Sequence, residues 1–223
     1  MLFYFCRLNQ FFRMNVIEIW KSFHENVIQT KWQEWTSTLF QIASVWYAKK
    51  NNVLVYPTGI IGVLLASYIY YFIADPPLYA DSILNVYYFL MSIYGWYNWV
   101  QKKNLEDVYP ISWCNRSELM NGILLFLASW ITIYYMLAAF TNSNTLMLDS
   151  LVSSSAVTSM WWMTKRKIEN WMAWIFSNII AVPLNFYKGF MLFTLMYLLF
   201  LSLAVSGLLE WKKIIGQTSN TKK

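Results

Sequence analysis

Hydrophobic stretches that contain no Asp, Glu, Lys or Arg recur along the chain, separated by short polar segments. A helix rises about 1.5 Å per residue, so roughly 20 residues cross a hydrocarbon core of about 30 Å. The stretch between Glu118 and Asp149 is too long for one crossing, and the Asn and Ser residues of 141–144 favour a turn within it. The pattern therefore predicts seven spanning helices, near residues 33–49, 54–74, 79–101, 119–140, 146–164, 169–187 and 189–210.

The composition agrees with an all-α integral membrane protein. Of the 223 residues, 58% are hydrophobic, 20% aromatic and 13% charged, whereas a soluble domain averages about 25% charged and 45–50% apolar residues. Lipid cannot satisfy the open edge of a sheet, so helices are required. Two cysteines and one histidine are too few for a disulfide framework or a multi-histidine metal centre, and no cofactor or metal is expected. The net charge of +6 fits basic membrane loops better than a nucleic-acid binder.

Two of the predicted spans, 33–49 and 146–164, are rich in Ser and Thr. Polar side chains at membrane depth normally face the interior of the bundle or a wet cavity rather than lipid. Small Ser residues also allow helices to pack closely, and the sequence leaves both interpretations open.

Residues 1–32 are predicted to form an N-terminal segment that does not span. The apolar run at its start is too short for a crossing and lacks the features of a signal peptide. Between Val16 and Ile28, the spacing of Trp20, Phe23 and Val27 predicts a helix that lies in the membrane interface. Translation could start at Met1 or at Met14, and the sequence does not decide between them.

Basic residues gather in alternate loops, which predicts the orientation of the chain. Twelve of the 17 Lys and Arg residues fall on one side: Lys49, Lys50, Lys102, Lys103, Arg116, Lys165, Arg166, Lys167, Lys212, Lys213, Lys222 and Lys223. Positively charged loops stay in the cytoplasm. The N-terminus is therefore predicted outside and the C-terminus inside.

An internal repeat is visible at the ends of the predicted helices. The segment 159–165 resembles 44–50 at an offset of 115 (159 − 44), and 207–213 resembles 95–103 at an offset of 112 (207 − 95). We therefore predict two parallel three-helix units, 33–103 and 146–213, joined by a linker helix within 104–145 and followed by a cytoplasmic tail, 214–223. Aromatic-then-basic helix ends also arise from interfacial anchoring, so chance similarity is the alternative. Parallel repeats are typical of transporters whose substrate site lies where the units meet.

Several Trp, Tyr, Asn and Gln side chains fall on single faces of the predicted helices. Amides in hydrocarbon need a hydrogen-bonding partner or a ligand, and Trp rings attract cations and stack on flat rings. The candidate binding residues are Trp171, Trp174, Asn178 and Asn185 in one helix, Asn85, Tyr88 and Trp96 in another, and Gln41 in a third. Trp171 stands near a helix end and has the alternative role of an interfacial anchor. Asp81 is expected to cap the end of a loop rather than bind a ligand.

The spans carry no charged residue near their centres, which disfavours coupling to protons. No phosphate-binding loop is present, so the chain is not expected to hydrolyse ATP. A membrane-embedded enzyme is a weaker alternative, because clustered carboxylates or a nucleophile with its base are missing. Coupling to sodium stays open.

The motif Trp171-x-x-Trp174-x-x-x-Asn178 resembles the Trp-x-x-Trp-x-x-x-Asn/Asp signature of PnuC-type vitamin transporters. The segments 50–52, Pro57-Thr58-Gly59-Ile60, Leu78-Tyr79-Ala80-Asp81 and 94–99 agree with this family, and the resemblance covers about 34–213.

This resemblance implies a bacterial inner-membrane protein with a plan similar to that of the SWEET proteins, but with full three-plus-one-plus-three helices. It implies uptake of a small vitamin, first of all nicotinamide riboside, by facilitated diffusion with alternating access. Thiamine and riboflavin are the alternative substrates. Members often form homo-oligomers, and a cytosolic kinase would trap the vitamin by phosphorylating it.

Overall fold

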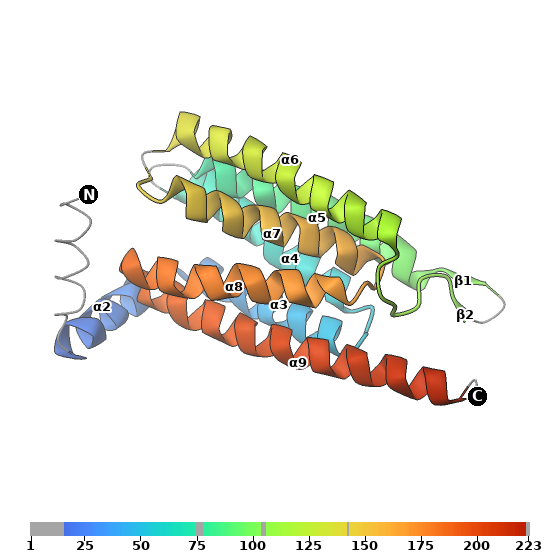
Figure 1. The fold of residues 1–223 in the computed structure, drawn as a ribbon. Helices are drawn as coiled ribbons and strands as arrows, with labels where there is room; N and C mark the ends of the chain where they lie inside the picture. The colour runs from blue at the N-terminus through green and yellow to red at the C-terminus, as the bar shows by residue number, and fades with distance from the viewer. Residues whose placement is uncertain (1–15, 75–77, 104–105, 142, 222–223) are drawn as a thin grey trace.

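The computed structural model describes residues 16–74, 78–103, 106–141 and 143–221, and it is almost entirely helical (Figure 1). Its helices are α2 (Val16–Gln29), α3 (Trp32–Lys49), α4 (Val55–Tyr68) with its π-helical continuation η1 (Ile69–Ile73), α5 (Tyr79–Val100), α6 (Arg116–Phe140), α7 (Leu146–Thr164), α8 (Glu169–Tyr187) and α9 (Met191–Thr221). Two short antiparallel strands, β1 (Lys102–Lys103) and β2 (Glu106–Asp107), form a hairpin after α5.

Each of the seven predicted spans coincides with one helix from α3 to α9. The boundaries agree within a few residues except in α9, which continues about ten residues beyond the predicted end. The predicted helix between Val16 and Ile28 corresponds to α2, whose Trp20 is 66% exposed. The part of the N-terminal segment before Val16 lies outside the described residues.

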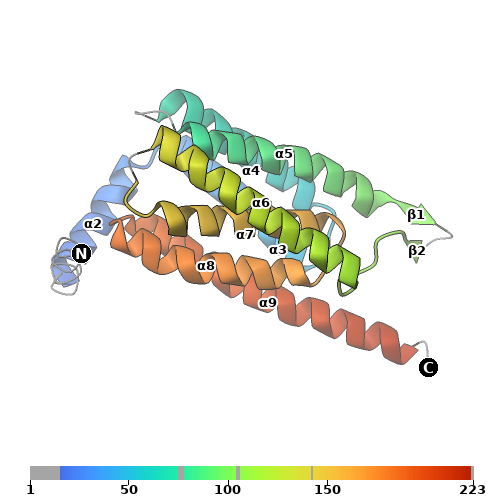
Figure 2. The same cartoon turned by 45° about the horizontal axis from the view of Figure 1, so that its top comes forward.

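The helices run along a common direction, and α2 leaves the bundle at one end (Figure 1). Helix α4 packs between α3 and α5, and α8 packs between α7 and α9. The two groups meet where α3 contacts α9 and α5 contacts α7, while α6 packs mainly on α7 and lies on the outside of the bundle (Figure 2). We call the end opposite α2 the basic end, because the helix ends there carry Lys49, Lys50, Lys102, Lys103, Arg116, Lys165, Arg166, Lys167, Lys212 and Lys213.

Within the described residues, three helical segments are both long and apolar enough to cross a membrane: Val55–Ile73, Arg116–Phe140 and Met191–Gln217. Helix α6 begins with a capping box, in which Asn115 and Glu118 satisfy each other's backbone N–H groups, so it starts sharply at the basic end. The other helices of the bundle contain more Ser, Asn, Tyr and Trp, and many of these side chains are buried inside the protein.

Helix α7 shows how its serines are accommodated. Ser150, Ser154 and Ser159 are completely buried and donate to carbonyls of their own helix, and Ser155 donates to Ala173 O of α8 at 2.8 Å. Small hydroxyl side chains that bond to nearby carbonyls let helices approach closely. Close packing therefore accounts for these serines, whereas Ser153 faces the central cavity described below.

Equivalent positions in the two helix groups make equivalent contacts. In the first group, Ser37 of α3 donates to the carbonyl of Gly62 in α4 at 2.8 Å. In the second, Ser177 of α8 donates to the carbonyl of Val152 in α7 at 3.0 Å. Val152 follows Ser37, and Ser177 follows Gly62, by the same 115 positions (152 − 37 and 177 − 62). The same pair of positions is thus bonded in each group.

Candidate functional site

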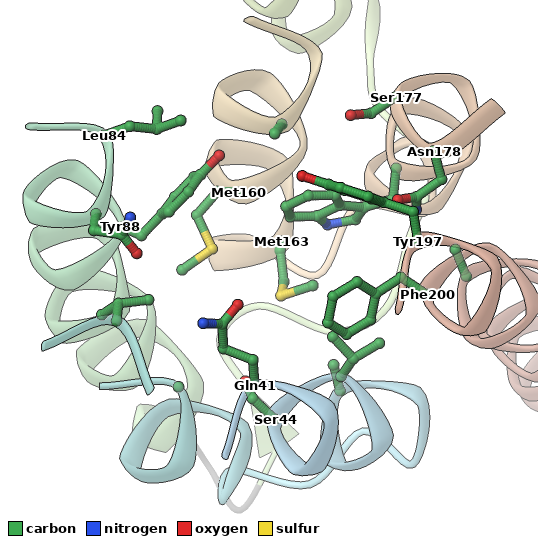
Figure 3. Close-up of a pocket in the computed structure, with 18 of the residues that line it drawn as sticks. Gln41, Ser44, Leu84, Tyr88, Met160, Met163, Ser177, Asn178, Tyr197 and Phe200 are labelled. Atoms are coloured by element: carbon green, nitrogen blue, oxygen red, sulfur yellow. The ribbon is translucent and has the colours of Figure 1, made fainter. Parts of the chain in front are cut away.

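A cavity of about 260 Å³ lies between the two helix groups and takes residues from α3, α4, α5, α7, α8 and α9. Its surface combines aromatic rings with a few polar side chains, as Figure 3 shows for Tyr88, Tyr197, Phe200, Gln41 and Asn178. Ligand sites for small organic molecules have this character, with an apolar wall and a few polar groups that fix orientation. Among the described residues, no group of three or more His, Cys, Asp or Glu is placed to hold a metal ion.

The cavity brings together most of the residues that the sequence singled out. Those that line it are Gln41, Asn85, Tyr88, Trp171, Trp174 and Asn178. Trp96 and Asn185 do not line it. Trp96 is 40% exposed on the surface of α5, and the amide of Asn185 donates to Ala181 O of its own helix at 2.8 Å.

Three carboxamides line the cavity, and that of Asn85 already donates to Asp81 O of its own helix at 2.8 Å. Asn178 is 3% exposed, and its side chain has no hydrogen-bonding partner within the described part of the chain. Gln41 donates from Nε2 to Ser37 Oγ at 3.1 Å, which holds the side chain in place. Because Ser37 in turn donates to a backbone carbonyl, the orientation of Gln41 is fixed by the α3–α4 contact. An unpaired buried amide is costly unless a ligand or water satisfies it.

Four buried aromatic residues, Tyr56, Trp99, Trp171 and Trp211, pack together toward the basic end, and we call them the aromatic floor. Tyr56 and Trp171 line the cavity, and Trp99 and Trp211 pack against them. Each is at most 2% exposed. Tyr56 meets Trp99 edge-on at 5.2 Å, Trp171 meets Trp211 edge-on at 5.5 Å, and the rings of Trp99 and Trp211 lie 6.1 Å apart between the groups. The complete burial of Trp171 shows that the alternative role as an interfacial anchor is wrong.

Hydrogen bonds from the aromatic floor join the two helix groups reciprocally. Trp99 of α5 donates from Nε1 to Met163 O at the end of α7, at 3.0 Å. Trp211 of α9 donates from Nε1 to Ala48 O near the end of α3, at 3.1 Å. Trp211 follows Trp99 by 112 positions, and Met163 follows Ala48 by 115. Each group therefore holds the other at the basic end.

Two glycines make room for the floor. A Cβ atom at Gly95 would lie 2.5 Å from the Tyr56 ring, and one at Gly207 would lie 2.7 Å from the Trp171 ring. Real Cβ atoms do not come so close to another heavy atom. Both positions therefore need a glycine to let a floor ring lie flat on the neighbouring helix.

Arg166 contacts Trp99 of the aromatic floor. Its guanidinium lies 4.4 Å from the centre of the Trp99 ring and donates to the carbonyls of Tyr109 at 2.9 Å and Trp99 at 3.3 Å. Asp107 of the hairpin forms an ion pair with it at 3.1 Å. Burial lowers the pKa of Arg166 from its ordinary value, and the carboxylate of Asp107 opposes this shift. The hairpin is thereby fastened to the floor.

The prediction that Asp81 caps a loop end is wrong. The first residue before α5 is Leu78, and no side chain caps this end of the helix. Asp81 stands in the first turn of α5, where it is exposed and also lines the cavity. It therefore marks the mouth of the cavity, at the end opposite the floor.

The sequence reasoning missed several residues that line the cavity, chiefly Tyr197 and Phe200 of α9. The predicted repeat contains the signal that would have found them. Tyr197 follows Asn85, and Phe200 follows Tyr88, by the same 112 positions that relate Gly207 to Gly95. A candidate binding residue in one predicted unit therefore predicts that the residue at the equivalent position of the other unit also lines the cavity.

Comparison with known proteins identifies the family. The family model described as nicotinamide mononucleotide transporter matches residues 31–213, which is most of the chain. The chain belongs to this family. The predicted resemblance to PnuC-type transporters is thereby confirmed, and the relatives are transporters rather than enzymes.

Individual relatives of this transporter family cover most of the chain at low identity. The nicotinamide riboside transporter PnuC of Escherichia coli (strain K12) is 23% identical over 81% of this chain and 84% of its own length. The riboflavin/roseoflavin transporter RibM of Streptomyces davaonensis is 21% identical over 54% of this chain and 58% of its own. The crystal structure of the vitamin B3 transporter PnuC matches the fold with a TM-score of 0.65 and 18% identity, over 89% of this chain and 88% of that one.

Proposed function

We propose that this protein takes up a small vitamin, nicotinamide riboside, across the bacterial inner membrane. The observation that carries the proposal is the central cavity, where Trp174, Tyr88 and the unpaired amide of Asn178 face the same space. Aromatic faces suit the flat, positively charged pyridinium ring, and amides suit a carboxamide and the hydroxyls of a ribose. The relationship to PnuC of Escherichia coli supports this substrate.

We also propose that seven helices span the membrane, as two units of three helices joined by one linker helix. The equivalent hydrogen bonds of Ser37 and Ser177, and the reciprocal bonds of Trp99 and Trp211, support two duplicated units, with α6 as the linker. By the distribution of Lys and Arg, the basic end faces the cytoplasm and Asp81 faces outward. The N-terminus is then outside and the C-terminus inside.

The mechanism is facilitated diffusion by alternating access. The aromatic floor closes the cavity on the cytoplasmic side, while exposed Asp81 stands at an outward mouth. Release into the cell requires the two units to separate at the floor, which breaks the bonds from Trp99 to Met163 and from Trp211 to Ala48. A cytosolic kinase would then keep the vitamin inside, and the protein would work as a homo-oligomer.

Riboflavin is the second candidate substrate, since the relative from Streptomyces davaonensis is a riboflavin/roseoflavin transporter. Thiamine, implied by the family resemblance, is the third. Proteoliposomes containing the purified protein, loaded with each unlabelled vitamin in turn, would distinguish them by counterflow of the labelled compound. We expect saturable exchange of nicotinamide riboside that needs no sodium or proton gradient. Absence of exchange for every vitamin would contradict the proposed function.

A further inference from the structure

The central cavity contains one charged side chain among the described residues that line it, the carboxylate of Asp81. All the other lining residues are apolar, aromatic, hydroxyl or amide side chains. A single charge at the mouth of an otherwise neutral pocket favours the approach of ligands of the opposite charge.

The carboxylate of Asp81 has no partner that neutralises it. Within the described residues, no Lys or Arg forms an ion pair with it. Lys188 forms its ion pair with Asp149, at 2.6 Å. The charge of Asp81 also acts on Tyr70 and Tyr197, which line the cavity. An incoming ligand therefore meets a carboxylate that has no ion-pair partner among the described residues.

We infer that Asp81 gives the cavity its preference for a ligand with a fixed positive charge over a neutral ligand of the same shape, an inference that rests on the proposed function. The chemistry is that of a quaternary ring nitrogen attracted by a carboxylate at the mouth, before the ring reaches Trp174 and Asn178 deeper in the cavity. Asp81 then separates charged pyridinium ligands from neutral ring systems such as flavins.

A structural role for Asp81 is the competing explanation. An acidic residue in the first turn of a helix stabilises that helix through the helix dipole. Such a role would lower the thermal stability of an Asp81→Asn variant, but it would change the binding of charged and neutral ligands by the same factor.

The test compares nicotinamide riboside with its dihydro form, in which reduction of the ring removes the positive charge and keeps the size. Inhibition of counterflow by each compound is measured for the wild-type chain and for Asp81→Asn in proteoliposomes. We expect the wild type to prefer the cation, and Asp81→Asn to weaken binding of the cation about 3- to 10-fold while that of the dihydro form stays within about twofold. Melting temperatures in detergent report the structural effect separately.

Glu34→Gln is the matched control. Glu34 lies in the first turn of α3, at the same end of the bundle, but lines a neighbouring cavity instead of the central one. Its charge also acts on Tyr70 of the central cavity, so Glu34→Gln should change the preference less than Asp81→Asn does. Three results would contradict the role of Asp81 but leave the proposed function standing. They are an equal loss of binding of both compounds in Asp81→Asn, an effect of Glu34→Gln as large as that of Asp81→Asn, and a wild type that shows no preference for the cation. A wild type that exchanges neither compound would overturn the proposed function and this inference with it.

Discussion

Trp211 donates a hydrogen bond from its indole nitrogen to the carbonyl oxygen of Ala48, at 3.1 Å, across 163 positions of sequence. Both residues are completely buried. The bond joins the last helix of the bundle to the first helix of the other group, and Trp99 makes its counterpart toward Met163. Opening the basic end requires the loss of both bonds.

Replacing Trp211 by Phe should therefore favour the state that is open at the basic end. The ring volume is largely kept, and the lost hydrogen bond is worth about 1 kcal/mol, or roughly a fivefold change in the population of the open state. A cysteine placed at Met160, which lines the cavity, reports this population in a background without native cysteines. A membrane-impermeant thiol reagent added from the basic side should label it about five times faster.

Trp46→Phe is the control for this prediction, because Trp46 lies at the same end of α3 and is 48% exposed. It should leave the labelling rate unchanged. Equal rates in Trp211→Phe and the parent would show that this bond does not hold the floor closed.

Gly207→Ala should destabilise the protein by about 1–3 kcal/mol, because a Cβ atom there would lie 2.7 Å from the buried Trp171 ring. Gly216→Ala, in the same helix, has no atom within 4 Å of its new Cβ. It should gain roughly 0.5–1 kcal/mol from the helix propensity of Ala. Melting temperatures in detergent would move in opposite directions for the two variants. A lowered melting temperature in both would show that the Trp171 contact is not the cause.

Asn178→Ala should abolish uptake, because the cavity loses an amide that has no partner within the described structure. Asn185→Ala is the matched control in the same helix, since the amide of Asn185 bonds to Ala181 and does not line the cavity. Its uptake should stay near that of the wild type. Transport in cells, normalised to the amount of protein in the membrane, would distinguish the two.

Trp174→Ala and Trp96→Ala likewise compare a residue that lines the cavity with a control residue that does not. Trp174 lines the cavity, whereas Trp96 is 40% exposed on α5. Only the first should lose uptake. A loss confined to Trp96→Ala would place the substrate on the other side of α5.

Cys114 should react slowly with thiol reagents. Burial, together with the hydrogen bond and charge of Glu169, raises the pKa of its thiol to about 12, so very little thiolate exists at pH 8. Glu169→Gln removes a charge that opposes ionisation and should lower the pKa. Alkylation rates against pH, in a Cys6→Ser background, should show a faster reaction for Glu169→Gln. Identical profiles would show that Glu169 does not control this thiol.

The sequence predicted the helices well because their ends are marked by charge. The gaps between charged residues located α3 to α9 within a few residues, apart from the end of α9. The hairpin at 102–107 was not predicted, because its two short strands have no alternating pattern of apolar and polar residues. Its placement depends on the ion pair between Asp107 and Arg166, which are far apart in sequence.

The site was predicted less completely, and Trp96 shows why. Successive helical residues are rotated by about 100°, and Gly95 already faces the Tyr56 ring. Trp96 is therefore turned away from the interior, although its spacing from Asn85 and Ser92 places it on a polar stripe. Asn185 was predicted to bind the ligand but does not line the cavity, and its amide donates a hydrogen bond to Ala181 O of its own helix instead. Periodicity identifies a face but not what that face meets.

The bonds of Ser37 and Ser177 have a consequence for tracing the ancestry of the two halves. Alignment sets Ser37 against Val152 and Gly62 against Ser177, so both columns read as mismatches. Yet both pairs of helices are joined by a hydrogen bond from a serine hydroxyl to a backbone carbonyl. The serine lies in the first helix of one pair, α3, and in the second helix of the other pair, α8. Under the proposed duplication, divergence has preserved an interaction while exchanging the residue that supplies it.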